Sequence, residues 1–314
     1  MRIGGGDFCY EWVEDWGLAA KEKWKDIREI AGITVDHMDH VYLLTRVEPP
    51  VIKMSKSGEI LDFFGGDVFV RPHGIYLDKD GSIYGVDDRG HAVYHFDREK
   101  KLIRTLGERN KPSDTGCPPG GKYHQVQHGG APFNRPTRLV IDQEGMIYIT
   151  DGYGNARVHK FDRAGNLLKS WGEPGEGPGQ FNLPHGIGID SQGILYVADR
   201  QNHRIQRFTT DGEFVDAWAG FHRPSDVWID DNDTIFVAEC KRTSEFNAYP
   251  SRVSILNRNG ELLARLNQET MYDLELGSRC AHGLAVDSEG SLYIAEVGKK
   301  LKDNFFGVRK YKRV

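Results

Sequence analysis

Three histidines in this 314-residue chain stand in the same local setting. His73, His185 and His282 each precede a glycine at the start of an apolar run, in the segments PHG, PHG and AHG. Three imidazoles that converge on one point and leave one side open are the donor set of a catalytic divalent metal such as zinc. The alternative is that histidine is only a favourable residue at the start of a strand. The other histidines of the chain do not share this local setting.

These histidines belong to a repeat that runs through the whole chain. Each copy has an apolar run ending in Asp, a turn usually closed by Gly, and a second apolar run, which is the pattern of an antiparallel hairpin. A third and a fourth strand follow in most copies, and four strands make one propeller blade. The copies begin at Ala31, Pro72, Pro136, Pro184, Pro224 and Ala281.

The repeat predicts an all-β fold, a six-bladed β-propeller that forms a single domain over residues 1–314. We expect Phe8–Trp16 to complete the last blade, because this tie between the two ends of the chain removes an exposed sheet edge. Residues 20–30 have only a weak helical period. Two α/β domains are excluded, because no amphipathic helices of about 10 to 15 residues alternate with the strands.

The repeat also places the histidines relative to one another. In chain order, the residue before the glycine of the first strand, or before its counterpart, is Ala31, His73, Thr137, His185, Ser225 and His282. Histidine thus occupies blades two, four and six, which lie about 120° apart around the axis, so the three imidazoles are expected to meet there. We expect the loops after the second strands to surround them, together with the long connections Glu108–Phe133 and Asn267–Cys280.

With these features the chain resembles the NHL-repeat six-bladed propellers and, among them, the peptidyl-α-hydroxyglycine α-amidating lyases, also called peptidylamidoglycolate lyases. The resemblance covers nearly all of the chain and is strongest from Asn134 to Phe208. It implies a catalytic zinc ion on three histidines. The matching ligands are His73, His185 and His282.

The resemblance further implies a catalytic tyrosine at Tyr153, in TDGY, and active-site arginines at Arg204, in ADRQNHRI, and Arg46, in YLLTR. The implied reaction is cleavage of the N–C bond of a carbinolamide, which releases an amide and glyoxylate. In that chemistry the metal acts as a Lewis acid or supplies bound hydroxide, the tyrosine is the general base, and an arginine clamps a carboxylate. Three histidines do not select zinc over iron, manganese or nickel.

Some positions depart from the family pattern. Gly283 follows His282 where the family often has an aspartate that contributes to a structural calcium, so Ca²⁺ is not expected. Cys280 replaces a methionine and is a candidate for the pocket wall or a soft metal ligand, although a buried inert thiol is favoured. Gly154 replaces a disulfide cysteine. The family's peptide-directed members work beside a copper monooxygenase, which this chain does not encode, so the expected substrate is a peptide-terminal or small-molecule α-hydroxy acid or a related amide-bearing acid.

Two other functions fit parts of the sequence. Acidic residues end the second strands, and gluconolactonase-like propellers use acidic sets to bind calcium or zinc for lactone hydrolysis. These residues are Asp87, Asp151, Asp199, Glu239 and Glu296, and they could equally cap loop amides. A non-catalytic NHL interaction scaffold is the other alternative, and the ordered histidines count against it.

Composition and apolar patterning argue against nucleic-acid binding, membrane insertion and secretion. Lys and Arg number 41 against 46 Asp and Glu, a formal charge of −5, which gives no general attraction for nucleic acid. No apolar run reaches the roughly 18 residues of a membrane span, and the start lacks a secretory signal. Four cysteines are too sparse for a disulfide framework, so we expect a cytoplasmic protein. The cysteines are Cys9, Cys117, Cys240 and Cys280.

Overall fold

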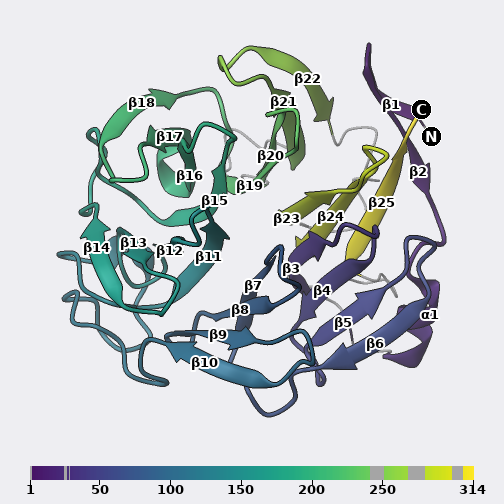
Figure 1. The fold of residues 1–314 in the computed structure, drawn as a ribbon. Coiled ribbons are helices and arrows are strands. Elements are labelled where there is room, and N and C mark those ends of the chain that lie inside the picture. The colour runs from purple at the N-terminus through teal and green to yellow at the C-terminus, as the bar shows by residue number, and fades with distance from the viewer. Residues whose placement is uncertain (1, 25–26, 28, 241–250, 268–279, 299–306) are drawn as a thin grey trace. The chain divides into compact units, whose positions relative to one another are not determined.

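The computed structural model describes residues 2–24, 27, 29–240, 251–267, 280–298 and 307–314. Strands dominate this part of the chain (Figure 1). Its helices are one short α-helix and two 3₁₀ turns, α1 (Leu18–Lys23), η1 (Tyr123–Gln125) and η2 (Arg200–Asn202). In the described residues, none of these helices has the length and apolar character needed to cross a membrane.

The described strands form six antiparallel sheets. Five sheets contain four strands each, taken consecutively from the chain. The first is β3 (Ile30–Val35), β4 (Val41–Thr45), β5 (Val51–Met54) and β6 (Ile60–Phe64). The second is β7 (Pro72–Leu77), β8 (Ile83–Asp87), β9 (Ala92–Phe96) and β10 (Leu102–Leu106). The third is β11 (Pro136–Ile141), β12 (Ile147–Asp151), β13 (Arg157–Phe161) and β14 (Leu167–Trp171).

The fourth sheet is β15 (Pro184–Ile189), β16 (Leu195–Asp199), β17 (Arg204–Phe208) and β18 (Phe214–Trp218). The fifth is β19 (Pro224–Ile229), β20 (Ile235–Glu239), β21 (Arg252–Leu256) and β22 (Leu262–Asn267). The sixth sheet joins the two ends of the chain in the order β1 (Arg2–Gly5), β2 (Phe8–Val13), β25 (Val308–Arg313), β24 (Leu292–Val297) and β23 (Cys280–Val286).

The fold is therefore the predicted all-β six-bladed propeller, and the N-terminal strands complete its last blade. β2 pairs with β25, with Trp12 opposite Tyr311, so the predicted strand from Phe8 is confirmed and ends at Val13. The sequence did not predict β1, which adds a fifth strand to this sheet. In its described residues, the weakly helical segment contributes one short helix, α1.

Recurring aspartates explain why the hairpins form where the repeat predicts them. Asp142 Oδ1 accepts the backbone N–H groups of Glu144 and Met146, both at 2.9 Å, and its Oδ2 accepts the hydroxyl of Tyr148 at 2.8 Å. Gly145 supplies the left-handed backbone of the turn, with φ at 83°. Asp190 and Asp287 make the same hydrogen bonds in later copies.

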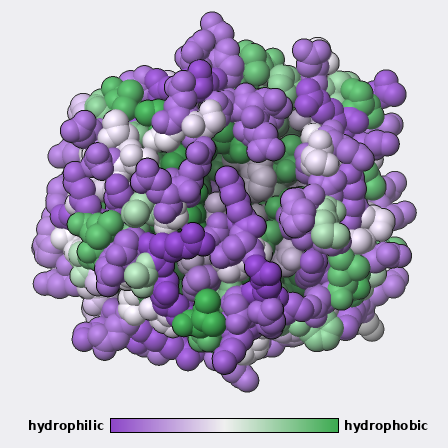
Figure 2. All heavy atoms as spheres, in the orientation of Figure 1, coloured by the Kyte–Doolittle hydropathy of each residue, from purple (hydrophilic) through white to green (hydrophobic). Residues whose placement is uncertain are grey.

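Two compact units can be described separately, residues 69–227 and residues 1–68 with 228–314. Within the first, branched and aromatic side chains of the third and fourth sheets share a core that includes Val158, Trp171, Val197 and Phe208. Burying each such side chain stabilises the fold by about 1.5–3 kcal/mol. Hydrophilic residues cover most of the face seen in Figure 2. The single domain over residues 1–314 stays a prediction.

Candidate metal centre

In residues 69–227, His73 on β7 and His185 on β15 point their rings toward each other. Each side chain is 2% exposed, and the ring centroids lie 4.9 Å apart. The Nδ1 atom of His73 lies 2.8 Å from the carbonyl oxygen of Thr137, and Nδ1 of His185 lies 2.6 Å from that of Ser225. Both carbonyls belong to the repeat-equivalent residue of the next blade.

These hydrogen bonds determine the tautomer of both neutral rings. A carbonyl oxygen only accepts, so Nδ1 must carry the proton and donate it. The lone pair of each imidazole is therefore on Nε2, which is the state required of a metal ligand. Proximal carbonyls of this kind also hold the ring in one orientation.

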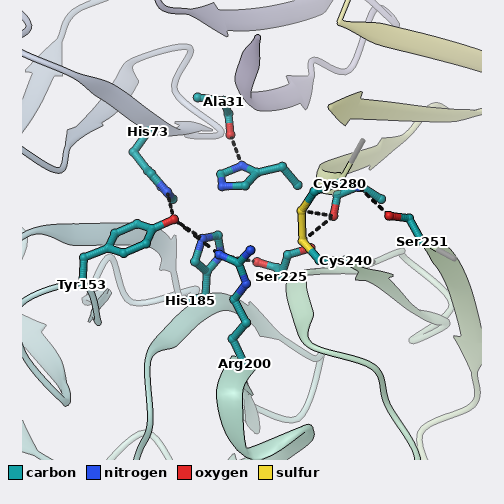
Figure 3. Close-up of a disulfide and its surroundings, with 11 residues drawn as sticks. Ala31, His73, Tyr153, His185, Arg200, Ser225, Cys240, Ser251 and Cys280 are labelled. Atoms are coloured by element: carbon teal, nitrogen blue, oxygen red, sulfur yellow. Dashed lines mark hydrogen bonds between the residues drawn. A yellow bond between two sulfur atoms is a disulfide. The ribbon is translucent and has the colours of Figure 1, made fainter. Parts of the chain in front are cut away.

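Both Nε2 atoms face the hydroxyl of Tyr153. The Oη atom lies 3.2 Å from Nε2 of His73 and 3.1 Å from Nε2 of His185 (Figure 3). A phenol has one proton and can donate it to only one of these two acceptors, whereas a single cation accepts lone pairs from both. The donor set beside Tyr153 thus fits a metal ion.

The third histidine lies in the other unit and has the same surroundings. His282 on β23 is 4% exposed, and its Nδ1 lies 2.8 Å from the carbonyl oxygen of Ala31. Its tautomer therefore also leaves the lone pair on Nε2. With His73 and His185 it makes up a buried group of three histidines that could hold a metal ion.

Glycines after the histidines allow the close approach of neighbouring first strands. A Cβ atom on Gly74 would lie 2.5 Å from the carbonyl oxygen of Thr137. One on Gly186 would lie 2.5 Å from Cα of Asp226 and 2.8 Å from the carbonyl oxygen of Ser225. Because both neighbours are backbone, a side chain here would push the strands apart and lengthen the histidine–carbonyl bonds.

Two arginines that sequence reasoning missed accompany Tyr153. Arg200, 8% exposed, places Nη1 at 3.4 Å from the Tyr153 hydroxyl. The guanidinium carbon of Arg135 lies 5.3 Å from the centre of the Tyr153 ring. Arg200 stands in the same ADR motif as Arg204, and Arg135 directly precedes the proline of the repeat. The motif and the repeat could therefore have pointed to both arginines.

The two predicted arginines lie in other surroundings. Arg204 donates through Nε to Asp199 at 2.8 Å and through Nη1 and Nη2 to the carbonyls of Glu176, Gly177 and Gln180. Arg46 donates through Nη1 to Glu29. Their catalytic roles stay predictions.

The acidic strand ends serve loop backbones. Asp87, with no exposed surface, accepts the N–H groups of Val70, Arg71 and Gly90 at 2.6–2.8 Å. Asp151 accepts the N–H group of Asn134 at 2.7 Å. In the other unit, Glu239 and Glu296 pair with Arg252 and Arg309. Asp87 and Asp151 thus have the capping role that competed with an acidic metal site, whereas the two glutamates form ion pairs.

The structure corrects the prediction of a buried inert thiol at Cys280. Cys280 forms a disulfide with Cys240, whose Cα lies 4.5 Å away (Figure 3). Cys9 and Cys117 are free. Disulfides persist mainly in oxidising compartments, so this bond removes the cysteine-based argument for a cytoplasmic location, which stays a prediction.

The connection 108–133 packs against the loop that carries Tyr153. Thr115 donates its hydroxyl to the carbonyl of Gly154 at 2.7 Å, and Gly130 donates its N–H to Asn155 at 3.1 Å. The other long connection predicted on this face, with the loops at 241–250 and 299–306, lies outside the described residues apart from its ends.

Fold and site together define a six-bladed β-propeller with a buried histidine group that could bind a metal. The NHL repeat matches residues 133–161 and 181–208. The chain is 31% identical to NHL repeat-containing protein 3 of Mus musculus, over 85% of this chain and 76% of that protein. It belongs to the NHL-repeat family.

Relatives also include amidating lyases. The chain is 32% identical to a probable peptidyl-alpha-hydroxyglycine alpha-amidating lyase of Caenorhabditis elegans, over 37% of this chain and 29% of that protein. It is 30% identical to peptidyl-alpha-hydroxyglycine alpha-amidating lyase 2 of Drosophila melanogaster, over 48% and 34%. The matched part of the chain thus spans about a third of the length of these relatives.

Solved structures share the fold at low sequence identity. A gluconolactonase from Xanthomonas campestris superposes with a TM-score of 0.61 and 13% identity, covering 99% of this chain and 96% of that one. A streptogramin B lyase gives a TM-score of 0.59 and 14% identity, covering 91% and 94%. At these identities the likeness concerns the fold alone.

Proposed function

We propose that this protein is a zinc-dependent lyase that cleaves the N–C bond of an N-acyl-α-hydroxyglycine, releasing an amide and glyoxylate. The observation that carries the proposal is the convergence of two imidazole Nε2 atoms on the Tyr153 hydroxyl. The relation to amidating lyases at about 30% identity supports the reaction class. A peptide-terminal or small N-acyl substrate would be used.

His73, His185 and His282 would hold the metal through Nε2, each ring being oriented by a carbonyl at Nδ1. When bound, a divalent ion such as zinc supplies Lewis-acid chemistry that makes the substrate hydroxyl more acidic. The fit of the donor set rests on the tautomers above.

Tyr153 would move the proton. In the reaction the substrate hydroxyl loses a proton and becomes the carbonyl of glyoxylate, while the N–C electron pair goes to the nitrogen. The nitrogen gains a proton and leaves as the amide, so the step is balanced without an oxidant or reductant. As a phenolate, the Tyr153 Oη atom beside both Nε2 atoms would accept the first proton and return it to the nitrogen.

Arg200 would bind the substrate carboxylate. Its Nη1 atom faces the Tyr153 hydroxyl at 3.4 Å, so an anion that reaches the phenol also reaches the guanidinium. Charge-assisted hydrogen bonds from a guanidinium fix both the position and the orientation of a carboxylate. The side chain is buried, which strengthens such contacts.

The test measures glyoxylate release from α-hydroxyhippurate and the metal content of the same samples. Tyr153→Phe should keep the metal and lose about 100-fold in turnover, because the proton carrier is missing. His185→Ala should lose both the metal and the turnover. His128 is an exposed histidine, and His128→Ala should lose neither the metal nor the turnover. A metal-loaded protein that opens a sugar lactone and leaves α-hydroxyhippurate intact would contradict the proposal in favour of a hydrolase. A protein with neither activity would favour the interaction scaffold.

A further inference from the structure

Arg135 occupies a position at which the repeat does not require an arginine. It directly precedes the proline that begins β11, and its φ is 70°, a left-handed backbone. The equivalent residue is Arg71 before β7 and Arg223 before β19, but before β15 it is Leu183, with φ at 67° and 2% exposure. The scaffold therefore accepts either an arginine or an apolar side chain here. Arg71 uses its guanidinium to pair with Asp88, whereas the guanidinium of Arg135 lies over the ring of Tyr153.

Hydrogen bonds on both sides hold the Arg135 backbone in this conformation. Its N–H lies 3.1 Å from Nδ1 of His91, and its carbonyl accepts the N–H of Tyr153 at 3.4 Å. The next pair along, Gly154 N–H to the carbonyl of Asn134, is 3.0 Å long. These hydrogen bonds tie the backbone of Arg135 to that of Tyr153.

The connection 108–133 positions the side chain. Nη1 of Arg135 donates to the carbonyl of Gly121 at 2.7 Å, which leaves the guanidinium over the Tyr153 ring. This contact uses one of the five N–H groups of the guanidinium. Both Arg135 and Tyr153 are half-buried, so a ligand can reach them from solvent.

Two guanidinium groups therefore lie beside one tyrosine, one at its hydroxyl and one over its ring, in a chain with a net charge of −5. In the proposed function, Arg200 would bind a carboxylate that lies close to the hydroxyl. We propose that Arg135 is a specificity-determining residue, which makes the site select ligands with an anionic carboxylate over otherwise identical neutral ligands. This inference rests on the proposed function and adds the residue that discriminates by charge.

The experiment measures binding without turnover. Hippurate carries the carboxylate and lacks the reacting hydroxyl, and hippuramide is its neutral counterpart. Isothermal titration of the metal-loaded protein should give tighter binding of hippurate. Arg135→Leu, which copies the residue of the next blade, should weaken hippurate by about tenfold and leave hippuramide unchanged. Arg135→Lys should retain part of the preference, because it keeps the charge.

Arg163→Leu is the matched control, since Arg163 is an exposed arginine of the same unit. It should bind both ligands as the wild type does. Thermal melting of each variant separates a folding defect from a binding defect. Equal binding of the two ligands by the wild type would overturn the inference, and so would an unchanged hippurate preference in Arg135→Leu.

Turnover of α-hydroxyhippurate, measured in parallel, separates this inference from the proposed function. A protein that discriminates by charge through Arg135 without turnover would refute the lyase and keep the subsite. A protein that turns over normally with unchanged discrimination in Arg135→Leu would keep the lyase and refute the subsite.

Discussion

Arg200 and Arg204 stand four positions apart in one motif but have different surroundings, because Arg200 lies beside the Tyr153 hydroxyl and Arg204 beside Asp199. Arg204 pairs with Asp199, whose carboxyl has no exposed surface. Burial raises the pKa of Asp199 to about 6, while hydrogen bonds from Asn182, Asn202 and Arg204 act in the opposite direction. Removing the guanidinium would leave this carboxyl without its charged partner.

Arg204→Gln should therefore lower the free energy of unfolding by roughly 3–5 kcal/mol, the usual cost of breaking a buried ion pair. Arg163→Gln should change it by less than about 0.5 kcal/mol, because that side chain is exposed. Urea unfolding monitored by circular dichroism provides the measurement. A stable Arg204→Gln that has lost turnover would instead support the catalytic role that the sequence resemblance implies.

His91 makes stability depend on pH. Its pKa lies below the ordinary value of 6.5, chiefly because of burial and with a contribution from Arg135, against the opposing charges of Asp151 and Asp87. Its Nδ1 atom accepts the Arg135 N–H, which only the unprotonated nitrogen can do. The unfolded chain therefore binds this proton more readily than the folded one.

It follows that His91 contributes stability above pH 6.5 and that this contribution is lost as the pH falls through 6.5 toward the lower folded-state pKa. His91→Asn retains an acceptor that does not titrate and suits a left-handed backbone. Unfolding free energies at pH 7.5 and 5.5 should differ less in this variant than in the wild type. An equal difference in both proteins would show that His91 is not responsible.

At the scale of single residues, the sequence predicted those candidate site residues that occupy a recognisable position in the repeat or in a motif. The repeat alignment selected the three histidines, and the family motif selected Tyr153. The η2 turn brings Arg200 to Tyr153, while Arg204 begins β17 and reaches the loop at 176–180. Spacing alone does not specify that turn. The carbonyls at Nδ1 are backbone atoms, so no residue type marks them.

Among the secondary-structure elements, the approach of β15 to β19 is what places His185. Gly186→Ala should separate these strands, because the new Cβ meets backbone at 2.5 Å. We expect a loss of about 1–3 kcal/mol in stability and roughly tenfold or more in metal affinity, as the bond from His185 to Ser225 lengthens. Competition with a chelator measures the affinity.

Gly5→Ala is the matched glycine control, since a Cβ there meets nothing within 4 Å. It should leave stability and metal affinity unchanged. Metal affinity that is equal in Gly186→Ala and Gly5→Ala would show that the strand approach does not support the site.

The disulfide links Cys240, directly after β20, to Cys280 at the start of β23, two residues before His282. Closing a loop of 40 residues in sequence restricts the unfolded chain, and such bonds typically contribute about 2–4 kcal/mol. Cys240→Ser should lower the unfolding free energy by this amount, and Cys9→Ser should not. Thiol titration of the unfolded, unreduced protein should find two free thiols, whereas four would contradict the bond.

Strands were predictable wherever the hydrogen bonds of the connecting turn join residues that are close in sequence. In the third, fourth and sixth copies an aspartate, a glycine and a tyrosine define the hairpin, and their hydrogen bonds occur within a few residues of sequence. β1 escaped prediction because RIGG has no alternating pattern and pairs through its backbone with β2. The disulfide escaped prediction because its two cysteines are 40 residues apart in sequence and belong to different blades.

At the scale of the whole molecule, the sixfold repeat made the fold readable, because each blade is a local unit whose order in the chain is its order in the fold. The chemistry is less local. His73, His185 and His282 come from three separate copies, and each ring depends on a carbonyl from a further copy. The proposed metal centre would therefore draw on all six copies of the repeat, so a test of metal binding also tests the predicted architecture.

X-ray absorption at the metal edge, with the metal content of the same purified sample, tests this claim most directly. The account predicts about one zinc or similar ion per chain, with three imidazole nitrogens at about 2.0–2.1 Å. His73→Ala, His185→Ala and His282→Ala should each abolish that signal. A stoichiometric ion that survives all three substitutions, or a zinc-replete protein that binds none, would contradict the account.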